Sequence, residues 1–270
     1  MTQDIPVRAP RFDLHDVPRD WLGGASLPSR IVDALSLVFP DGERFFIRSV
    51  RHYLPGIEDP QLRARVRGFF GQEGRHGHEH AKFNRLLERH GFDPERFLQL
   101  YVRIAYETIE PRVPPHLRLS ATVALEHLTA TLAELALDSP LLDDADPELR
   151  DLLYWHACEE IEHKSVAFDV LAEVDPRYAT RLIGAGIAVA MLAGFMGLAL
   201  AMLLRDDGPA RESEAGRRFF EALAARRGWI ARAWVDYLRP GFHPDDQDNY
   251  HLAEAFLRQL DARLAVARAA

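Results

Sequence analysis

The sequence lacks the features of several large protein classes. It has one cysteine, Cys158, which excludes an intrachain disulfide and is typical of a protein in a reducing compartment. Lysine is scarce and the formal net charge is −8, which argues against a nucleic-acid-binding protein with a basic face. Residues 1–14 contain no apolar stretch of the kind found in a signal peptide. Together these absences predict a cytoplasmic protein that does not bind nucleic acid.

Segments with the alternating pattern of β-strands are also missing, and apolar residues instead recur every three or four positions. Hydrophobic residues make up 47% of the 270-residue chain, enough for a sizeable core. Prolines that follow an aspartate or another proline mark several helix starts. The pattern predicts an all-α protein with helices at about 28–38, 40–53, 60–91, 93–110, 114–137, 146–173, 175–204, 212–238 and 249–268.

Two Glu-x-x-His motifs, Glu73 with His76 and Glu160 with His163, lie inside long predicted helices. Residues three apart share one helix face, so each motif can present both side chains to one metal site. Each motif also continues an apolar stripe, where a glutamate is unfavourable unless it is paired or binds a metal. The alternative is that these glutamates form salt bridges with arginines on the surface. The phase of the two motifs favours a buried site.

An earlier helix in each half of the chain carries one glutamate in its own apolar stripe, Glu43 in the first half and Glu126 in the second. A glutamate from each of two helices and Glu-x-x-His from each of two others is the ligand set of ferritin-like di-iron bundles. We therefore predict a ferritin-like four-helix bundle with additional helices, holding two metal ions. The predicted ligands are Glu43, Glu73, His76, Glu126, Glu160 and His163.

Four carboxylates offset two divalent cations, and oxygen and imidazole ligands without a thiolate favour iron, with manganese or zinc as alternatives. His156, His80 and His127 are candidates for an additional ligand or for a group behind the ligands. By helical phase, His78 and Glu79 point elsewhere and are expected in solvent. The predicted divisions are an N-terminal extension at 1–27, the metal-binding bundle at 28–175, and the apolar and C-terminal helices at 176–270.

Four segments together resemble a bacterial family labelled "predicted metal-dependent hydrolase". They are FPDGERFFIRSVRHY (39–53), FFGQEGRHGHEH (69–80), LEHLTA (125–130) and WHACEEIEHKSVAFDV (155–170). The resemblance covers roughly 28–170, with weaker similarity through LRPGFHP (238–244). It implies metal-dependent hydrolysis, although the order of the ligands is more like that of ferritin-type di-iron proteins.

An uncharged apolar run extends from Leu182 to Leu204 between two arginines. As a helix it would be about 34 Å long, enough to cross a bilayer. A single crossing conflicts with the charges, because arginines after the run favour a cytoplasmic C-terminal side while the bundle is also expected in the cytoplasm. We therefore expect the helix to pack in a homodimer or against a membrane surface rather than to cross a membrane.

Three functions are compatible with this pattern. The preferred one is O2-dependent oxidation of a small organic or lipid-like substrate at a di-iron centre, which requires an electron donor protein. The alternatives are a hydrolase in which two metals activate water, and a non-enzymatic iron-binding protein. No sequence motif identifies the substrate.

Overall fold

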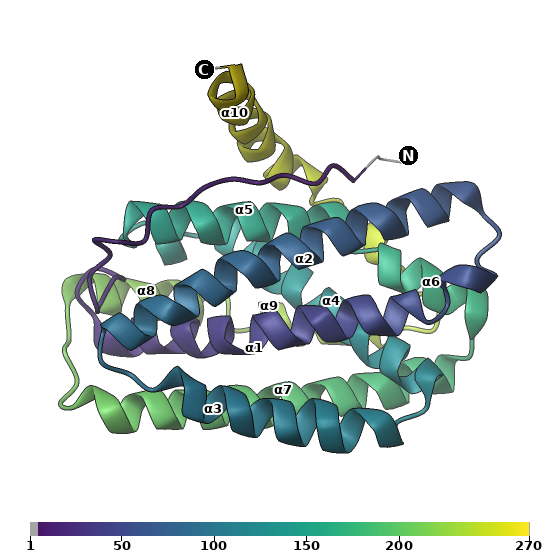
Figure 1. Ribbon diagram of the computed structural model, residues 1–270, viewed down its shortest axis with the longest axis horizontal. Coiled ribbons are helices and arrows are strands. Elements are labelled where there is room, and N and C mark those ends of the chain that lie inside the picture. Colours follow the sequence, from purple (N-terminus) through teal and green to yellow (C-terminus); the bar gives the residue numbers. More distant parts are fainter. Residues whose placement is uncertain (1–4, 270) are drawn as a thin grey trace.

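The computed structural model describes residues 5–269, with side chains for residues 5–260. These residues form helices, and the only β-type pairing among them is an isolated bridge between Leu22 and Ala145. The predicted all-α class with one long apolar helix is confirmed (Figure 1). The α-helices are α1 (Ser26–Arg51), α2 (Pro60–Arg89), α3 (Pro94–Tyr101), α4 (Pro115–Leu137), α5 (Pro147–His163), α6 (Val166–Val174), α7 (Tyr178–Asp207), α8 (Glu214–Ala225), α9 (Trp229–Tyr237) and α10 (Tyr250–Ala269).

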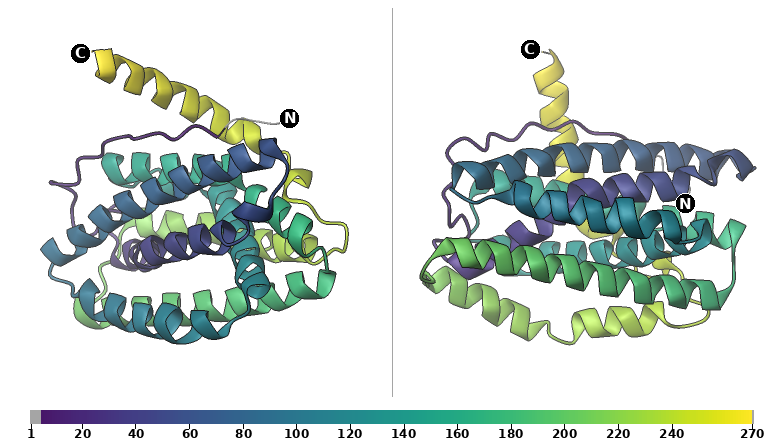
Figure 2. Two further views of the ribbon diagram at one scale, coloured as in Figure 1. Left: turned by 45° about the vertical axis from the view of Figure 1, so that its right-hand side comes forward. Right: turned by 60° about the horizontal axis from the view of Figure 1, so that its bottom comes forward.

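Four of these helices form the centre of the molecule. α1 packs along α2, α4 packs along α5, and α1 also contacts α4. α7 lies against α4 and α1 on one side of this group, together with α3 (Figure 1). α10 contacts α5 and then projects away from the other helices (Figure 2). The division of the chain at residues 28 and 176 stays a prediction.

The helix starts follow the local sequence signals. The side chains of Asp59, Asp93 and Asp146 each accept a hydrogen bond from a backbone N–H of the helix that follows, and each is followed by proline at the first helical position. Gly91 ends α2 with a positive φ of 85°, a conformation that favours glycine.

Three predicted boundaries were wrong. Pro40 lies inside α1, because buried residues on both sides of it, such as Val38 and Phe46, hold the helix together against its neighbours. The predicted helix at 146–173 is interrupted between α5 and α6, where the buried Lys164 donates hydrogen bonds to the 247–249 segment. The segment at 212–238 forms two helices, α8 and α9.

The apolar helix α7 has one covered and one exposed face. Its most apolar 18-residue window has a mean hydropathy of 2.5 and is 22% buried. A side chain on Gly184 would overlap Ser120, so α7 and α4 approach closely there. α6, which precedes α7, contacts α2 and α4. α8 and α9, which follow α7, contact α1 and α4, so the segments on both sides of α7 in sequence pack on the same bundle. Length and composition alone would allow α7 to cross a membrane.

Three clusters of buried apolar residues lie in the described part of the chain, and two of them are large. One large cluster contains Leu37, Phe83 and Leu152, and the other contains Phe46 and Phe69. Along α1 and α2, and from α5 into α6, the predicted metal ligands fall between residues of the two large clusters. Polar groups placed there are surrounded by apolar side chains above and below.

Candidate metal centre

The structure brings the six predicted ligand residues together between four helices. α1 supplies Glu43 and α4 supplies Glu126, while α2 and α5 each supply one Glu-x-x-His pair. All six side chains are buried, and none is more than 4% exposed. The predicted site residues therefore face one another and not the solvent.

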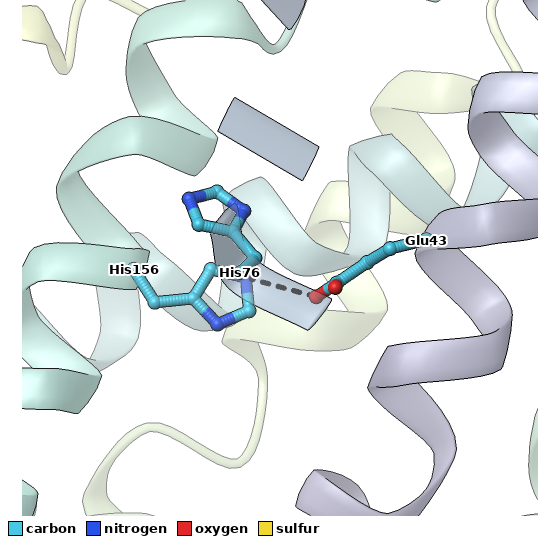
Figure 3. Close-up of side chains that lie close together, drawn as sticks. All are labelled: Glu43, His76 and His156. Atoms are coloured by element: carbon cyan, nitrogen blue, oxygen red, sulfur yellow. Dashed lines mark ion pairs between the residues drawn. The ribbon is translucent and has the colours of Figure 1, made fainter. Parts of the chain in front are cut away.

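The ligand atoms form overlapping groups. The nitrogen of His163 and oxygens of Glu73 and Glu126 lie within 4.8 Å of one another. Glu43, His76 and His156 form a second group of this kind, and Figure 3 shows Glu43 of α1 pointing toward the rings of both histidines. A third group joins Glu73 and His76 with Glu160.

Glu160 lies between the two main groups. Its Oε1 is 3.6 Å from Nε2 of His163, 3.5 Å from Nδ1 of His76 and 2.8 Å from Nε2 of His156. This carboxylate is therefore placed where it can contact ions held by either group.

Several atoms that point into this space have no hydrogen-bond partner among the described residues. They are both carboxylate oxygens of Glu43, Glu73 and Glu126, one oxygen of Glu160, Nδ1 of His76 and Nε2 of His163. His163 Nε2 lies 3.1 Å from an oxygen of Glu73, but the two atoms do not have hydrogen-bond geometry. A buried polar atom left unpaired costs about 1–3 kcal/mol, and more when it is charged. Lone pairs that converge without a shared proton fit a cation between them.

In His76 and His163, the ring nitrogen that faces away from the cluster has a hydrogen-bond partner. His163 Nδ1 lies 2.9 Å from Oε1 of Gln72, and His76 Nε2 lies 3.0 Å from Oε2 of Glu159. Metal-binding histidines commonly donate their second N–H to a carboxylate or carbonyl oxygen, which fixes the ring. These contacts leave His163 Nε2 and His76 Nδ1 facing the cluster.

Arg8 of the N-terminal segment joins both outer partners. It donates to Glu159 at 3.1 Å and to Glu162 at 2.8 and 3.1 Å. Glu162 in turn accepts a hydrogen bond of 2.6 Å from the amide of Gln72. The segment that carries Arg8 runs along α2 and α5 (Figure 1). Sequence reasoning missed these four residues because they lie outside the apolar stripes.

The three further histidines differ in position. His156 belongs to the cluster. Its Nδ1 is 2.7 Å from Nε2 of His80, so His80 contacts a residue of the cluster and is not itself in one of the three groups. His127 faces α9 instead, where its Nε2 is 2.9 Å from the carbonyl oxygen of Ala233 and its ring stacks on Tyr237.

The expectation that Glu79 is in solvent was wrong, whereas His78 is exposed as predicted. Glu79 is fully buried and accepts hydrogen bonds from Arg75 and Lys82 of its own helix. The side chains of Arg75 and Lys82 cover Glu79, so this carboxylate is buried although it lies outside the apolar stripe.

The electrostatics of the cluster favour bound protons or cations. Burial, together with repulsion from Glu73, raises the pKa of Glu126 to about 8 and that of Glu43 well above its usual value. Burial opposes the charging of His76, but the hydrogen bond to Glu159 and the nearby carboxylate of Glu160 outweigh it and raise the pKa to about 10. Burial likewise opposes ionisation of Glu160, yet the neighbouring histidines hold its pKa well below the usual range.

A helical fold with a buried cluster of carboxylates and imidazoles defines a candidate metalloprotein. The chain belongs to the family of predicted metal-dependent hydrolases, which it matches over residues 6–248. The matched range includes all six residues of the cluster and also Arg8, and it confirms the resemblance found in the four sequence motifs. No curated protein and no solved structure matches the chain. The relation to ferritin-like bundles stays a prediction.

Proposed function

We propose that this protein is a hydrolase whose cluster binds two divalent metal ions. The observation that carries the proposal is the set of buried lone pairs that converge without a hydrogen-bond partner among the described residues. Glu73, Glu126 and His163 would hold one ion, and Glu43, His76 and His156 the other, with Glu160 between them. The family membership supports hydrolysis over the oxidation preferred from the sequence.

Two such ions would supply an activated water and polarise the bond to be cleaved. The side chains around them contribute position and surroundings. Gln72 and Glu159 fix the two motif histidines, and the apolar clusters on either side keep bulk water from the carboxylates. In a medium that excludes water, the attraction between these carboxylates and the cations is stronger than at the surface.

A second candidate function is oxidation of an organic substrate by O2 at a di-iron centre. The observation that favours it is the donor set of four glutamates and two histidines without a thiolate, in the order used by di-iron bundles. This reaction would also need an electron donor. Hydrolysis needs neither O2 nor electrons, so the two candidates can be separated by experiment.

The test begins with full-length protein freed of metal by a chelator and reloaded anaerobically with Mn²⁺, Zn²⁺ or Fe²⁺. We expect up to two ions per chain and hydrolysis of carboxylic or phosphate esters without O2 or reductant. Turnover that requires iron, O2 and a reductant would favour the second candidate. Failure to retain any of the three metals would overturn both.

A variant makes this test specific to the cluster. Glu160→Gln removes the carboxylate that lies near both histidines of the motifs, so we expect loss of at least one ion and of most of the activity. Glu148→Gln removes a charge from the exposed start of the same helix and serves as the matched control. Elemental analysis of both variants, next to the activity, checks the assignment. Unchanged metal content in Glu160→Gln would contradict it.

A further inference from the structure

An apolar cavity lies between α1, α4, α7 and the π-helix η2 (Val102–Ile109) that continues α3. It contains about 660 Å³ of space between atoms, part of it open to solvent, but only about 80 Å³ admits the centre of a water molecule. The cavity is therefore narrow. Its walls include Val38, Phe45, Ala121, Ile187, Met191 and Phe195.

A second, smaller cavity continues the first toward the metal cluster. It contains about 420 Å³ between atoms, of which about 50 Å³ admits the centre of a water molecule. Gly42 and Leu192 line both cavities, so the two adjoin. Glu43, one of the six cluster residues, forms part of the inner wall together with Phe39, whose ring packs on His156. Together the two cavities form one passage.

The outer end of the passage reaches the surface. Tyr106, Glu110 and Arg118 line both the outer cavity and an open hollow on the surface. Arg48 holds Glu110 through two hydrogen bonds of 3.0 and 2.6 Å, so this carboxylate is fixed at the side of the opening. The passage thus leads from solvent, between apolar side chains, to Glu43 at the cluster.

We propose that the passage binds the unbranched hydrocarbon chain of a fatty-acyl ester, with the ester group at the Glu43 end. Apolar walls select a hydrocarbon ligand, and the small width excludes a bulky ring system. Gly42 keeps the junction open, because a Cβ there would meet only the hydroxyl groups of Tyr101 and Tyr106 at 3.8 and 4.0 Å, and a larger side chain would extend into the space.

The position of the ester rests on the proposed function, whereas binding of the chain does not. In the reaction, water adds across the bond between the acyl carbon and the alcohol oxygen. The acyl carbon keeps the new oxygen as a carboxylate, the alcohol leaves with a proton, one proton is released, and no electrons are transferred. No further reactant is needed.

The first measurement is binding of saturated fatty acids of increasing length to the full-length protein, by displacement of a fluorescent fatty acid. Fatty acids contain no ester, so they are not consumed. We expect affinity to rise about three- to fourfold for each added methylene until the passage is full. Equal affinity for butanoate and dodecanoate would overturn the proposal.

The second measurement uses a variant at the junction. Gly42→Leu fills the space that both cavities share, and by excluding a few methylene groups it should weaken dodecanoate binding by about tenfold or more. Gly197→Leu adds the same side chain at an exposed glycine of α7 with open space around it, and should bind as the wild type does. If Gly42→Leu does not fold, Leu192→Trp narrows the same junction from α7. A folded junction variant with unchanged dodecanoate affinity would overturn the proposal.

Ester kinetics separate this proposal from the proposed function. In the wild type, kcat/KM should rise with the length of the acyl chain until the passage is full. Gly42→Leu should lower kcat/KM for a dodecanoyl ester by about tenfold or more, whereas Gly197→Leu should leave it nearly unchanged. Chain binding without metal-dependent hydrolysis would contradict the proposed function alone. Metal-dependent hydrolysis of esters with no dependence on chain length would contradict the passage alone.

Discussion

Arg8 is the residue on which both outer hydrogen-bond networks of the cluster meet. Its guanidinium contacts Glu159, the partner of His76, and Glu162, the partner of Gln72. It is 6% exposed, so little solvent competes for these contacts. The N-terminal segment therefore contributes to the cluster although it supplies none of the candidate ligands.

We expect Arg8→Gln to weaken metal binding by up to about 10-fold, because loss of a group that hydrogen-bonds a ligand costs about 10- to 100-fold and Arg8 lies one contact further out. The reason is that Glu159 and Glu162 lose the charge that orients them, so the two histidine rings become less well fixed. Competition with a metal-sensitive fluorescent chelator measures the affinity. Arg11→Gln, at an exposed position of the same segment, is the control. Equal affinities for the two variants would show that Arg8 has no role in positioning the ligands.

The contribution of sequence to the site can be judged residue by residue. The phase of each helix placed Glu73, His76, Glu160 and His163 on buried faces, and the structure brings them together. The helical phase of a residue indicates which face of its own helix the side chain lies on. It does not indicate which residues of other segments contact that side chain. The partners supplied by neighbouring segments, such as Arg8, could not be found in this way.

At the scale of helices, local signals defined the starts but not the interruptions. The Asp-Pro starts of α2, α3 and α5 were found because a cap depends on residues within one turn. The continuity of α1 through Pro40 depends on packing against α2 and α4, and the interruption after α5 coincides with contacts between Lys164 and the 247–249 segment. Such contacts between distant segments override the local preference of the chain.

The packing of α7 on α4 gives a prediction for this helix. Gly184→Val should lower the free energy of unfolding by about 1–3 kcal/mol, because the added side chain overlaps both the side chain and the backbone of Ser120. Gly186→Val is the matched control, since Gly186 has open space around it on the same helix. Urea unfolding of the two variants measures the difference. If α7 left the bundle to enter a membrane, the two substitutions would have the same effect.

At the scale of the molecule, the arrangement of α8 and α9 bears on how α7 meets its surroundings. Both helices follow α7 and contact the central bundle, and α6, which precedes α7, contacts α2 and α4, so the chain on either side of α7 packs on the same bundle (Figure 2). Ile183, Val189 and Leu204 on the outer face of α7 are 53%, 46% and 39% exposed. Contact of this exposed face with a second copy or with a membrane surface stays a proposal.

Metal and pH should act together on the stability of the whole fold. In the metal-free protein the pKa of Glu126 is raised from 4.5 to about 8 and that of His76 from 6.5 to about 10. Between pH 6.5 and 8 the folded state therefore keeps protons that the unfolded chain has already lost, and rising pH destabilises the fold. Cations that replace these protons remove this loss, so stabilisation by metal should grow as pH rises.

The measurement is the Tm with and without Mn²⁺ or Zn²⁺ at pH 6 and pH 8. Free metal at about 100 times the Kd adds about 2.7 kcal/mol, which corresponds to on the order of 5–10 °C in a protein of this size. The increment should be larger at pH 8, because fewer protons compete for the carboxylates and imidazoles. In Glu160→Gln the increase in Tm on adding metal should be smaller at both pH 6 and pH 8, because the variant lacks the carboxylate placed between the two proposed ions. An increment that falls between pH 6 and pH 8 would show that the metal binds outside the cluster.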